Sequence, residues 1–226
     1  MNKKVGVNSK ISGRVGWNFV KVGAVAWTAG IALLSLSGCN SEVDGRPSAQ
    51  SSPSDPTQGI RQTADDGKPL PFHNKYPDRW NSANSGTAYE PCNADDESLI
   101  HIGIDPQTIE DAATVNGQTL RGCNWHYSPE ESEFLSAYQI VGNSESLNWY
   151  KVQNRVGSNW HPDITINGRT VGIASDKSGG CMTYVQSGTA GVVTGSGYGL
   201  LPSLPENEIC GYAIDLTRAT IDKIPK

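Results

Sequence analysis

The sequence contains five cysteines, and the first of them stands in a pattern with a defined chemistry. Cys39 follows Leu36-Ser37-Gly38 at the end of an uncharged apolar stretch, residues 22–37. This is the pattern of a bacterial lipobox, in which the small residues admit a protease and the cysteine thiol takes a thioether-linked lipid. We therefore predict lipidation at Cys39 after cleavage of the preceding bond.

The residues before Cys39 have the composition of an export signal. Residues 1–38 hold five basic side chains and no acidic one, and the apolar stretch is 16 residues long. A transmembrane helix needs about 20 apolar residues, whereas a signal-peptide core is shorter. We expect residues 1–38 to be a lipoprotein signal peptide for the general secretory route. The alternatives are an uncleaved signal anchor, or a secreted protein in which Cys39 is incidental.

The remainder of the chain is acidic. Residues 39–226 hold 13 of the 18 basic side chains and all 23 acidic ones, which gives a net charge of −10. Because this composition indicates no basic surface, we predict that nucleic acid is not a partner. The partner that the sequence predicts is the lipid bilayer, reached through the acylated Cys39.

Two further regions follow the signal. Residues 39–86 are rich in Ser, Pro, Asp, Gln and Gly and lack apolar periodicity, so we expect a flexible tether with a reach of about 35–40 Å. Its last part, residues 70–80, contains aromatic side chains that allow it to lie on the following domain. Residues 87–226 are long enough to form one core.

The pattern of residues 87–226 predicts an α+β domain, an antiparallel sheet with flanking helices. Asp105 as N-cap and Pro106 at the first position favour a helix over residues 106–115. Asn167-Gly168 predicts the turn of a hairpin over residues 164–173. The other expected elements are helices over 94–102, 147–156 and 206–223, strands over 122–127 and 134–141, and a hairpin over 181–194 around Ser187-Gly188.

The four cysteines of the domain are expected to form two disulfides, because an exported protein enters an oxidising compartment. They allow three pairings, which the sequence does not distinguish. We favour Cys92–Cys123 and Cys181–Cys210, since each would tie a helix to a strand and close a loop of about 30 residues. No two cysteines have the short spacing of a zinc ribbon, and no calcium-binding loop is present. We predict no metal and no cofactor.

These motifs resemble a known family. The order of Pro91-Cys92, Gly122-Cys123-Asn124-Trp125 and Ile166-Asn167-Gly168-Arg169, followed by Cys181 and Cys210, is similar to that of the actinobacterial cysteine-paired lipoproteins of unknown function, which include LprB and LprC. The resemblance spans residues 89–225 and the lipobox. It implies a small α+β domain, akin to the PsbP-like fold, with two intramolecular disulfides and no established reaction, and it assigns no catalytic residue.

The residues give little sign of catalysis. The segment Gly195–Gly199 superficially resembles a phosphate-binding loop, but no lysine follows it and no long apolar strand precedes it. The four histidines are scattered along the chain, and none is paired with another His or a Cys at helical spacing. We predict no catalytic residue and a protein that is not an enzyme.

Aromatic and amide residues point instead to ligand binding. The candidate binding residues are Trp149, Tyr150, Trp160, His161 and Tyr198. We hypothesise that two loops, residues 157–163 and 195–201, border a common cleft, because binding residues are often carried on loops of a rigid scaffold. The competing interpretation is that these aromatic side chains pack the sheet and the loops are separate surface turns.

Together these features predict a non-catalytic lipoprotein of the cell envelope, anchored in the cell membrane on its extracytoplasmic face, that binds a ligand or a partner. One alternative is a hydrolase of cell-wall material, which would need a histidine or an acidic pair in a cleft. A second is a structural accessory of an envelope or secretion complex, which a large exposed apolar patch would favour.

Overall fold

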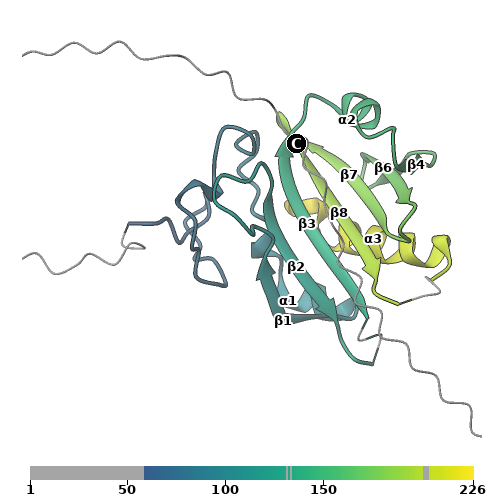
Figure 1. The fold of residues 1–226 in the computed structure, drawn as a ribbon, viewed down its shortest axis with the longest axis horizontal. Helices are drawn as coiled ribbons and strands as arrows, with labels where there is room; N and C mark the ends of the chain where they lie inside the picture. Colours follow the sequence, from purple (N-terminus) through teal and green to yellow (C-terminus); the bar gives the residue numbers. More distant parts are fainter. Residues whose placement is uncertain (1–58, 131, 133, 201–203) are drawn as a thin grey trace, which may run out of the picture. The chain divides into compact units, whose positions relative to one another are not determined.

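The computed structural model describes residues 59–130, 132, 134–200 and 204–226 (Figure 1). The predicted signal peptide, Cys39 and the first part of the predicted tether lie outside these residues. Within them, no helix has both the length and the apolar character needed to cross a membrane.

The domain is built on one antiparallel sheet of eight strands, which confirms the predicted α+β class. The strand order is β1-β2-β3-β8-β7-β6-β4, and β5 pairs with β6 beside this path. The strands are β1 (Ile104–Asp111), β2 (Arg121–Tyr127), β3 (Leu135–Asn143), β4 (Ser158–Trp160), β5 (Ile164–Ile166), β6 (Arg169–Asp176), β7 (Cys181–Ser187) and β8 (Ala190–Tyr198).

Two helices cover one face of the sheet. The helices α1 (Asp96–His101) and α3 (Glu206–Thr220) lie behind the sheet in the view of Figure 1, while α2 (Leu147–Gln153) lies at one end of it, near β7. The side of α3 that meets the sheet is apolar and includes the fully buried Ile209, Ala213 and Leu216. The apolar side chains of α3 therefore pack against one face of the sheet and leave the opposite face without cover from α1 or α3.

Alternation along β3 shows how the two faces differ. Leu135, Ala137, Gln139 and Val141 are buried, and Ser136, Tyr138 and Ile140, which alternate with them, are partly exposed. Successive side chains of a strand point to opposite faces, so this pattern places the buried set under α3. The partly exposed set, which includes Tyr138, lies on the other face, called the open face below.

Both predicted hairpins are confirmed. Asn167 and Gly168 adopt positive φ angles of 47° and 75° between β5 and β6, as a two-residue type I′ turn requires. The Asn167 side-chain amide also donates to both carboxylate oxygens of Asp222, at 3.0 and 2.9 Å. The second hairpin joins β7 to β8 with seven paired positions.

The predicted helix over residues 106–115 is wrong, because this segment forms the edge strand β1. Asp105 caps only a local turn, in which its carboxylate accepts from the backbone N–H of Gln107 at 2.9 Å. The pairing of β1 with β2 is irregular between Asp105 and Glu110. Proline, which has no N–H to donate, is tolerated at such an edge, and this explains how Pro106 fits into a strand.

Residues 59–93, called the strap below, pack on the domain, whereas a flexible coil was expected up to residue 86. The strap includes the two 3-10 turns η1 (Pro77–Arg79) and η2 (Pro91–Asn93). Its polar side chains Asn74, Arg79 and Asn84 are all buried. Each finds partners inside the fold, as when the Asn74 side-chain amide donates to the carbonyl of Arg61 at 2.9 Å.

Both favoured disulfide pairings are confirmed. Cys92 of η2 is bonded to Cys123 of β2, and their Cα atoms are 5.3 Å apart. Cys181 of β7 is bonded to Cys210 of α3, with a Cα separation of 4.9 Å. One bridge thus ties the strap to the sheet, and the other ties the covering helix to the sheet.

Candidate functional site

A depression of about 500 Å³ lies at the end of the open face where β3 and β8 pair. Its wall includes three aromatic side chains, of which Phe134 is 41% exposed and packs edge-on to Tyr198, with ring centroids 6.5 Å apart. The side chains that give it its chemistry are His126, Phe134, Ser136, Tyr138, Asp176 and Tyr198. We call it the open-face depression.

Glycines of β8 set the shape of its floor. A Cβ atom on Gly195 would come within 2.2 Å of Cζ of Tyr138, so the tyrosine ring lies across the strand where β8 has no side chain. Gly197 faces a more open space, because a Cβ there would be 3.6 Å from Oγ of Ser136. The floor is therefore low at Gly197 and is covered by an aromatic ring at Gly195.

Tyr138 and His126 bring free polar groups to this depression. Burial, and then the charge of Asp176, raises the pKa of Tyr138, so its hydroxyl keeps its proton at neutral pH. Within the described part of the chain, neither the Tyr138 hydroxyl nor the His126 ring has a hydrogen-bond partner. Both groups are available to a bound molecule.

Asp176 supplies the negative charge of the depression. Burial raises the pKa of Asp176, but hydrogen bonds from the Ser178 hydroxyl, at 2.6 Å, and from nearby backbone N–H groups outweigh burial and lower it overall. The carboxylate is therefore ionised at neutral pH and held in a turn. Neither Lys nor Arg is among the residues that line the depression.

Three of the predicted binding residues, Trp149, Tyr150 and Trp160, lie on α2 and on the edge strand β4. The Tyr150 ring packs on Tyr184, with centroids 4.6 Å apart, and meets Trp160 edge-on at 6.1 Å. Nζ of Lys151 lies 5.5 Å from the centroid of the Trp160 ring. Trp149, on the neighbouring position of α2, is 37% exposed. The aromatic packing that was the competing interpretation holds for Tyr150.

The two segments expected to form loops around a common cleft are largely strands. Residues 158–160 form β4, and residues 195–198 belong to β8. Trp160 is level with Gly195 of β8, with three strand spacings of about 4.8 Å each between them. Tyr198 is three residues further along β8, so about 17 Å separates the backbones of Trp160 and Tyr198. The structure places Tyr198 in the open-face depression and does not place Trp160 there.

His161 lies in a polar cluster at the start of α3. Its Nε2 is 3.1 Å from Oγ of Ser175 and 3.3 Å from a carboxylate oxygen of Glu206. The Ser175 hydroxyl donates to Glu206 at 3.1 Å, and since this uses its one proton, Nε2 acts as a donor in the cluster. In a Ser-His-acid triad the acid contacts Nδ1 and Nε2 accepts the serine proton. The cluster is therefore not arranged to activate Ser175.

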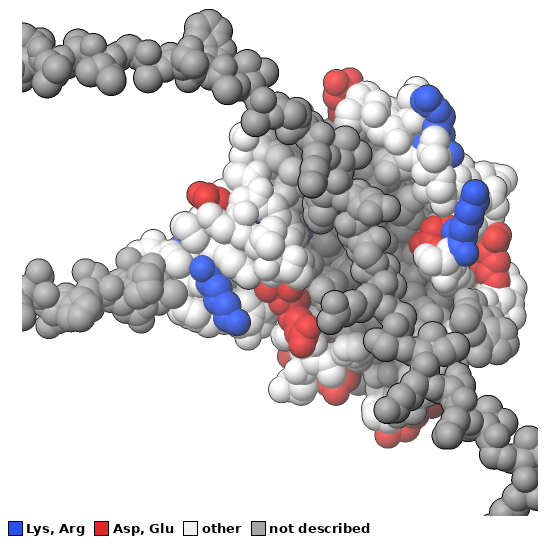
Figure 2. Space-filling view, viewed as in Figure 1, with Lys and Arg blue, Asp and Glu red and all other residues white. Residues whose placement is uncertain are grey.

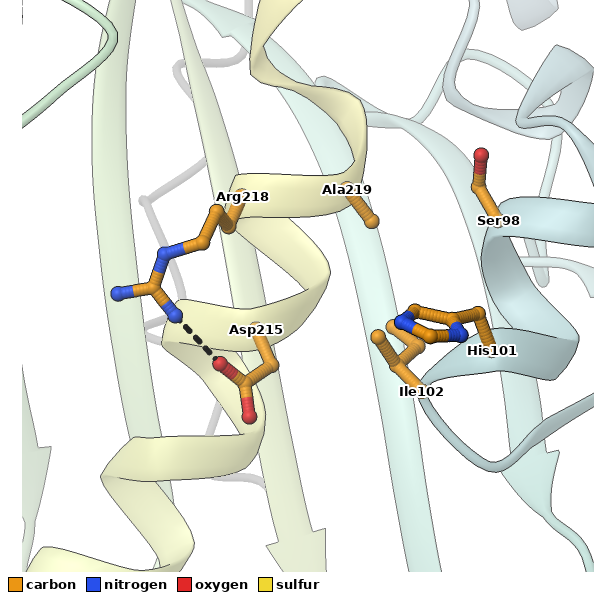
Figure 3. Close-up of a pocket in the computed structure, with 6 residues that line it drawn as sticks. All are labelled: Ser98, His101, Ile102, Asp215, Arg218 and Ala219. Atoms are coloured by element: carbon orange, nitrogen blue, oxygen red, sulfur yellow. Dashed lines mark hydrogen bonds and ion pairs between the residues drawn. The ribbon is translucent and has the colours of Figure 1, made fainter.

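A second hollow, of about 440 Å³, lies between α1 and α3 on the helical side of the domain. Figure 3 shows His101 of α1 and Ile102, the residue that follows this helix, pointing toward α3 across this hollow. Arg218 turns along its own helix to the carboxylate of Asp215, at 2.6 Å. The two charged side chains that line the hollow thus neutralise each other, which leaves it with little to recognise a ligand.

Comparison with known proteins places the chain in a family. The family model DUF3558, described as a protein of unknown function, matches residues 34–223. The chain belongs to this family. No curated protein and no solved structure shows significant similarity to it. The DUF3558 match includes Cys39 and all four cysteines of the two disulfides.

Sequence reasoning missed most residues of the open-face depression. It found Tyr198 but not His126, Phe134, Tyr138 or Asp176, which come from three strands and the residue before β3. One signal was available, because alternation along the expected strand 134–141 puts Tyr138 on the face opposite Leu135. The neighbours of Tyr138 on that face depend on strand order, which the sequence did not reveal.

Proposed function

We propose that this DUF3558 protein is a lipid-anchored protein of the cell envelope whose open-face depression binds a neutral, hydroxyl-rich ligand, such as a glycan, without chemically changing it. The observation that carries the proposal is the pairing of aromatic rings with unpartnered polar groups in one depression. Phe134 supplies an exposed ring that packs edge-on to the partly exposed Tyr198, and Tyr138 supplies a hydroxyl with no partner in the described part of the chain.

The charges of the depression favour this class of ligand. A phosphate or carboxylate ligand is usually held by Arg or Lys, and the lining residues include neither. The ionised Asp176 can accept hydrogen bonds from hydroxyl groups. The Tyr138 hydroxyl and the His126 ring can each donate or accept one. A sugar offers hydroxyls to these groups and an apolar ring face to the aromatic side chains.

The proposed anchor rests on the lipobox, Leu36-Ser37-Gly38-Cys39, behind a basic and then apolar segment. The family match begins at residue 34 and so includes this motif. The diacylated Cys39 would hold the domain on the extracytoplasmic face of the membrane, as in the actinobacterial lipoproteins that the sequence resembles. Intact-mass analysis of the membrane-extracted protein tests the anchor, since Cys39→Ser should remove both the lipid mass and the cleavage before residue 39.

Calorimetric titration of the lipidated protein in detergent with a panel of neutral oligosaccharides tests the depression. Phe134→Ala should weaken binding by about tenfold, because it removes one stacking face. Tyr138→Phe keeps the ring over Gly195 and loses only the hydroxyl, and it should weaken binding by a similar factor. Neither change should lower the melting temperature appreciably, since Phe134 is exposed and the Tyr138 hydroxyl holds no structural hydrogen bond in the described chain.

Trp149→Ala provides the matched control, because Trp149 is also an exposed aromatic residue but lies outside the depression. Its affinity should equal that of the parent protein. If no neutral oligosaccharide binds, or if Trp149→Ala weakens binding as much as Phe134→Ala does, the open-face depression is not the binding site.

A further inference from the structure

We propose that the outer side of α2 rests on an anionic lipid surface, so that the domain lies against the membrane to which Cys39 holds it. The surface consists of Trp149, Val152 and Val156, called the α2 ridge below, and includes the flanking Lys151 and Arg155. This inference rests on the proposed lipid anchor and does not depend on the proposed ligand.

The geometry of α2 exposes the ridge. The helix begins at Ser146, whose hydroxyl accepts from the backbone N–H of Trp149 at 3.1 Å. Trp149 and Val152 are three residues apart and therefore lie on one side of the helix, and Val156 lies three residues beyond the last residue of α2, Gln153. Their exposed fractions are 37%, 46% and 88%.

The inner side of α2 is already occupied. The Tyr150 ring packs on Tyr184 of β7, and the Leu147 side chain lies over Gly172 of β6. These contacts fix the helix on the sheet and point the ridge outward. None of the seven residues of α2 is buried, so the helix is held by one side and leaves the other to an external surface.

One basic side chain beside the ridge, that of Arg155, is not paired with a carboxylate in the described chain. Residues 146–162 contain Lys151 and Arg155, and the acidic residues that adjoin this segment are Glu145, which lines the same hollow as Trp149, and Asp163. Lys151 is paired with Asp163 at 2.5 Å, while Arg155 contacts the carbonyl of Val152 at 3.3 Å. Figure 2 shows basic side chains on the part of the surface where Figure 1 labels α2 and β4, with acidic side chains beside them. Arg155 is therefore the residue best placed to reach a phosphate.

The residue types and the size of the ridge favour lipid over a protein partner. Tryptophan and basic residues are typical of the membrane–water interface. A stable protein interface takes about 20–30 residues from each partner, far more than this ridge offers. A weak contact with lipid is enough to hold the ridge on the membrane, because the anchor keeps the domain close to the membrane and so raises the effective concentration of lipid headgroups.

The length of chain between the anchor and the domain permits the contact. Gly59, the first described residue, is 20 positions after Cys39. A chain of this length spans at most about 65–70 Å. Such a span exceeds the size of a domain of this length, roughly twice its radius of gyration of about 15 Å, so any face of the domain can reach the membrane.

Hydrogen exchange of the lipidated protein, reconstituted in vesicles, tests the proposal. Two vesicle types are compared, phosphatidylcholine alone and phosphatidylcholine with phosphatidylglycerol, with detergent as the reference. We expect the amides of residues 147–156 to exchange severalfold more slowly on the anionic vesicles than in detergent. On the neutral vesicles the slowing relative to detergent should be smaller. The double variant Val152→Ser with Val156→Ser should lose this protection while remaining folded, since both side chains are exposed.

The control is Ile100→Ser with Val115→Ser, which removes two other exposed apolar side chains of the domain, 62% and 59% exposed. It should keep the protection of residues 147–156. Equal exchange in detergent and in both vesicles, or equal loss of protection in the control, would overturn the lipid contact. Intact mass separates the two proposals: a protein without lipid at Cys39 refutes the anchor, whereas a lipidated protein without protection refutes only the α2 ridge.

Discussion

Arg79 donates to both carboxylate oxygens of Glu90, at 2.8 and 3.1 Å, and both side chains are shielded from solvent. Arg121 contacts the same carboxylate at 3.0 Å, and Asp111 accepts from Nε of Arg79 at 3.2 Å. Two guanidinium groups thus face two carboxylates in a neutral cluster. Burial lowers the pKa of Arg79, but Glu90 and Asp111 more than offset this, so the group stays charged.

This cluster explains why the strap belongs to the domain. Arg79 and Glu90 are strap residues, while Arg121 and Asp111 lie on β2 and β1. Arg121 also donates to the carbonyl of Thr87 in the strap at 2.8 Å. Detachment of the strap would leave Arg121 and Asp111 of the sheet without their charged partners. The strap and the sheet are therefore expected to unfold together.

Glu90→Gln tests the cluster. The change removes the charge that two buried guanidinium groups share, and breaking one partner of a buried pair costs about 3–5 kcal/mol. We expect the free energy of unfolding, measured in urea at neutral pH, to fall by this amount. The transition should remain single, because the strap is part of the same cooperative unit.

Asp65→Asn is the matched control. It breaks an ion pair of the strap too, between Asp65 and Arg61 at 2.5 Å, but both side chains of this pair are more than a third exposed. Exposed pairs contribute about 0–1 kcal/mol, so stability should hardly change. A Glu90→Gln protein as stable as the Asp65→Asn protein would show that the buried cluster does not stabilise the fold.

Joint replacement of Cys92 and Cys123 by Ala should lower the free energy of unfolding by about 2–5 kcal/mol. The bridge closes a loop of 31 residues, and its loss enlarges the unfolded ensemble. Peptide mapping of the unreduced parent protein should recover one peptide pair containing Cys92 and Cys123 and a second containing Cys181 and Cys210. A peptide pair that joins Cys92 to Cys210 would contradict the structure.

Sequence reasoning found the features that depend on residues close to one another in the sequence. The turn at Asn167-Gly168 follows from the positive φ that both residues tolerate. The apolar stripe of α3, with Ile209, Ala213 and Leu216 in the core, follows from helical periodicity alone. Both signals lie within a few residues of the structure they predict.

The features that it missed depend on distant partners. Asp105-Pro106 is a good helix start in isolation, but pairing with β2 overrides that local preference. The strap has the composition of a coil, and contacts with the distant sheet order it, among them the ion pairs of Arg79 and Glu90 and the Cys92–Cys123 disulfide. The open-face depression needs β2, β3 and β8 side by side, and no local pattern specifies that order.

Gly195→Ala should destabilise the domain by about 1–3 kcal/mol, because the new methyl group would displace the Tyr138 ring. The displaced ring would also disturb the floor of the depression, so oligosaccharide affinity should fall together with the melting temperature. Gly197→Ala is the control for stability on the same strand, since its methyl group would lie 3.6 Å from Oγ of Ser136 and fits without movement. An equal loss of stability in the two variants would contradict the described packing of Tyr138.

The buried tyrosines of the open face predict a loss of stability in alkali. Burial, and then the neighbouring Tyr138 and Tyr184, raises the pKa of Tyr150 to about 12. In the unfolded chain this hydroxyl ionises near its ordinary pKa of about 10. Between these two values the unfolded state binds fewer protons than the folded state, so the free energy of unfolding falls as the pH rises. At about 1.4 kcal/mol for each unit of pKa difference, Tyr150 alone removes on the order of 2–3 kcal/mol by about pH 12.

Tyr150→Phe isolates this contribution, because it keeps the ring that packs on Tyr184 and removes the group that ionises. Urea unfolding at about pH 8 should give nearly equal stability for the variant and the parent, since the hydroxyl is protonated in both states there. As the pH approaches about 12, the variant should become the more stable protein, and tyrosinate absorbance of the parent should rise in step with its unfolding. A parent protein that ionises all its tyrosines near pH 10 while still folded would show that Tyr150 is not buried as described.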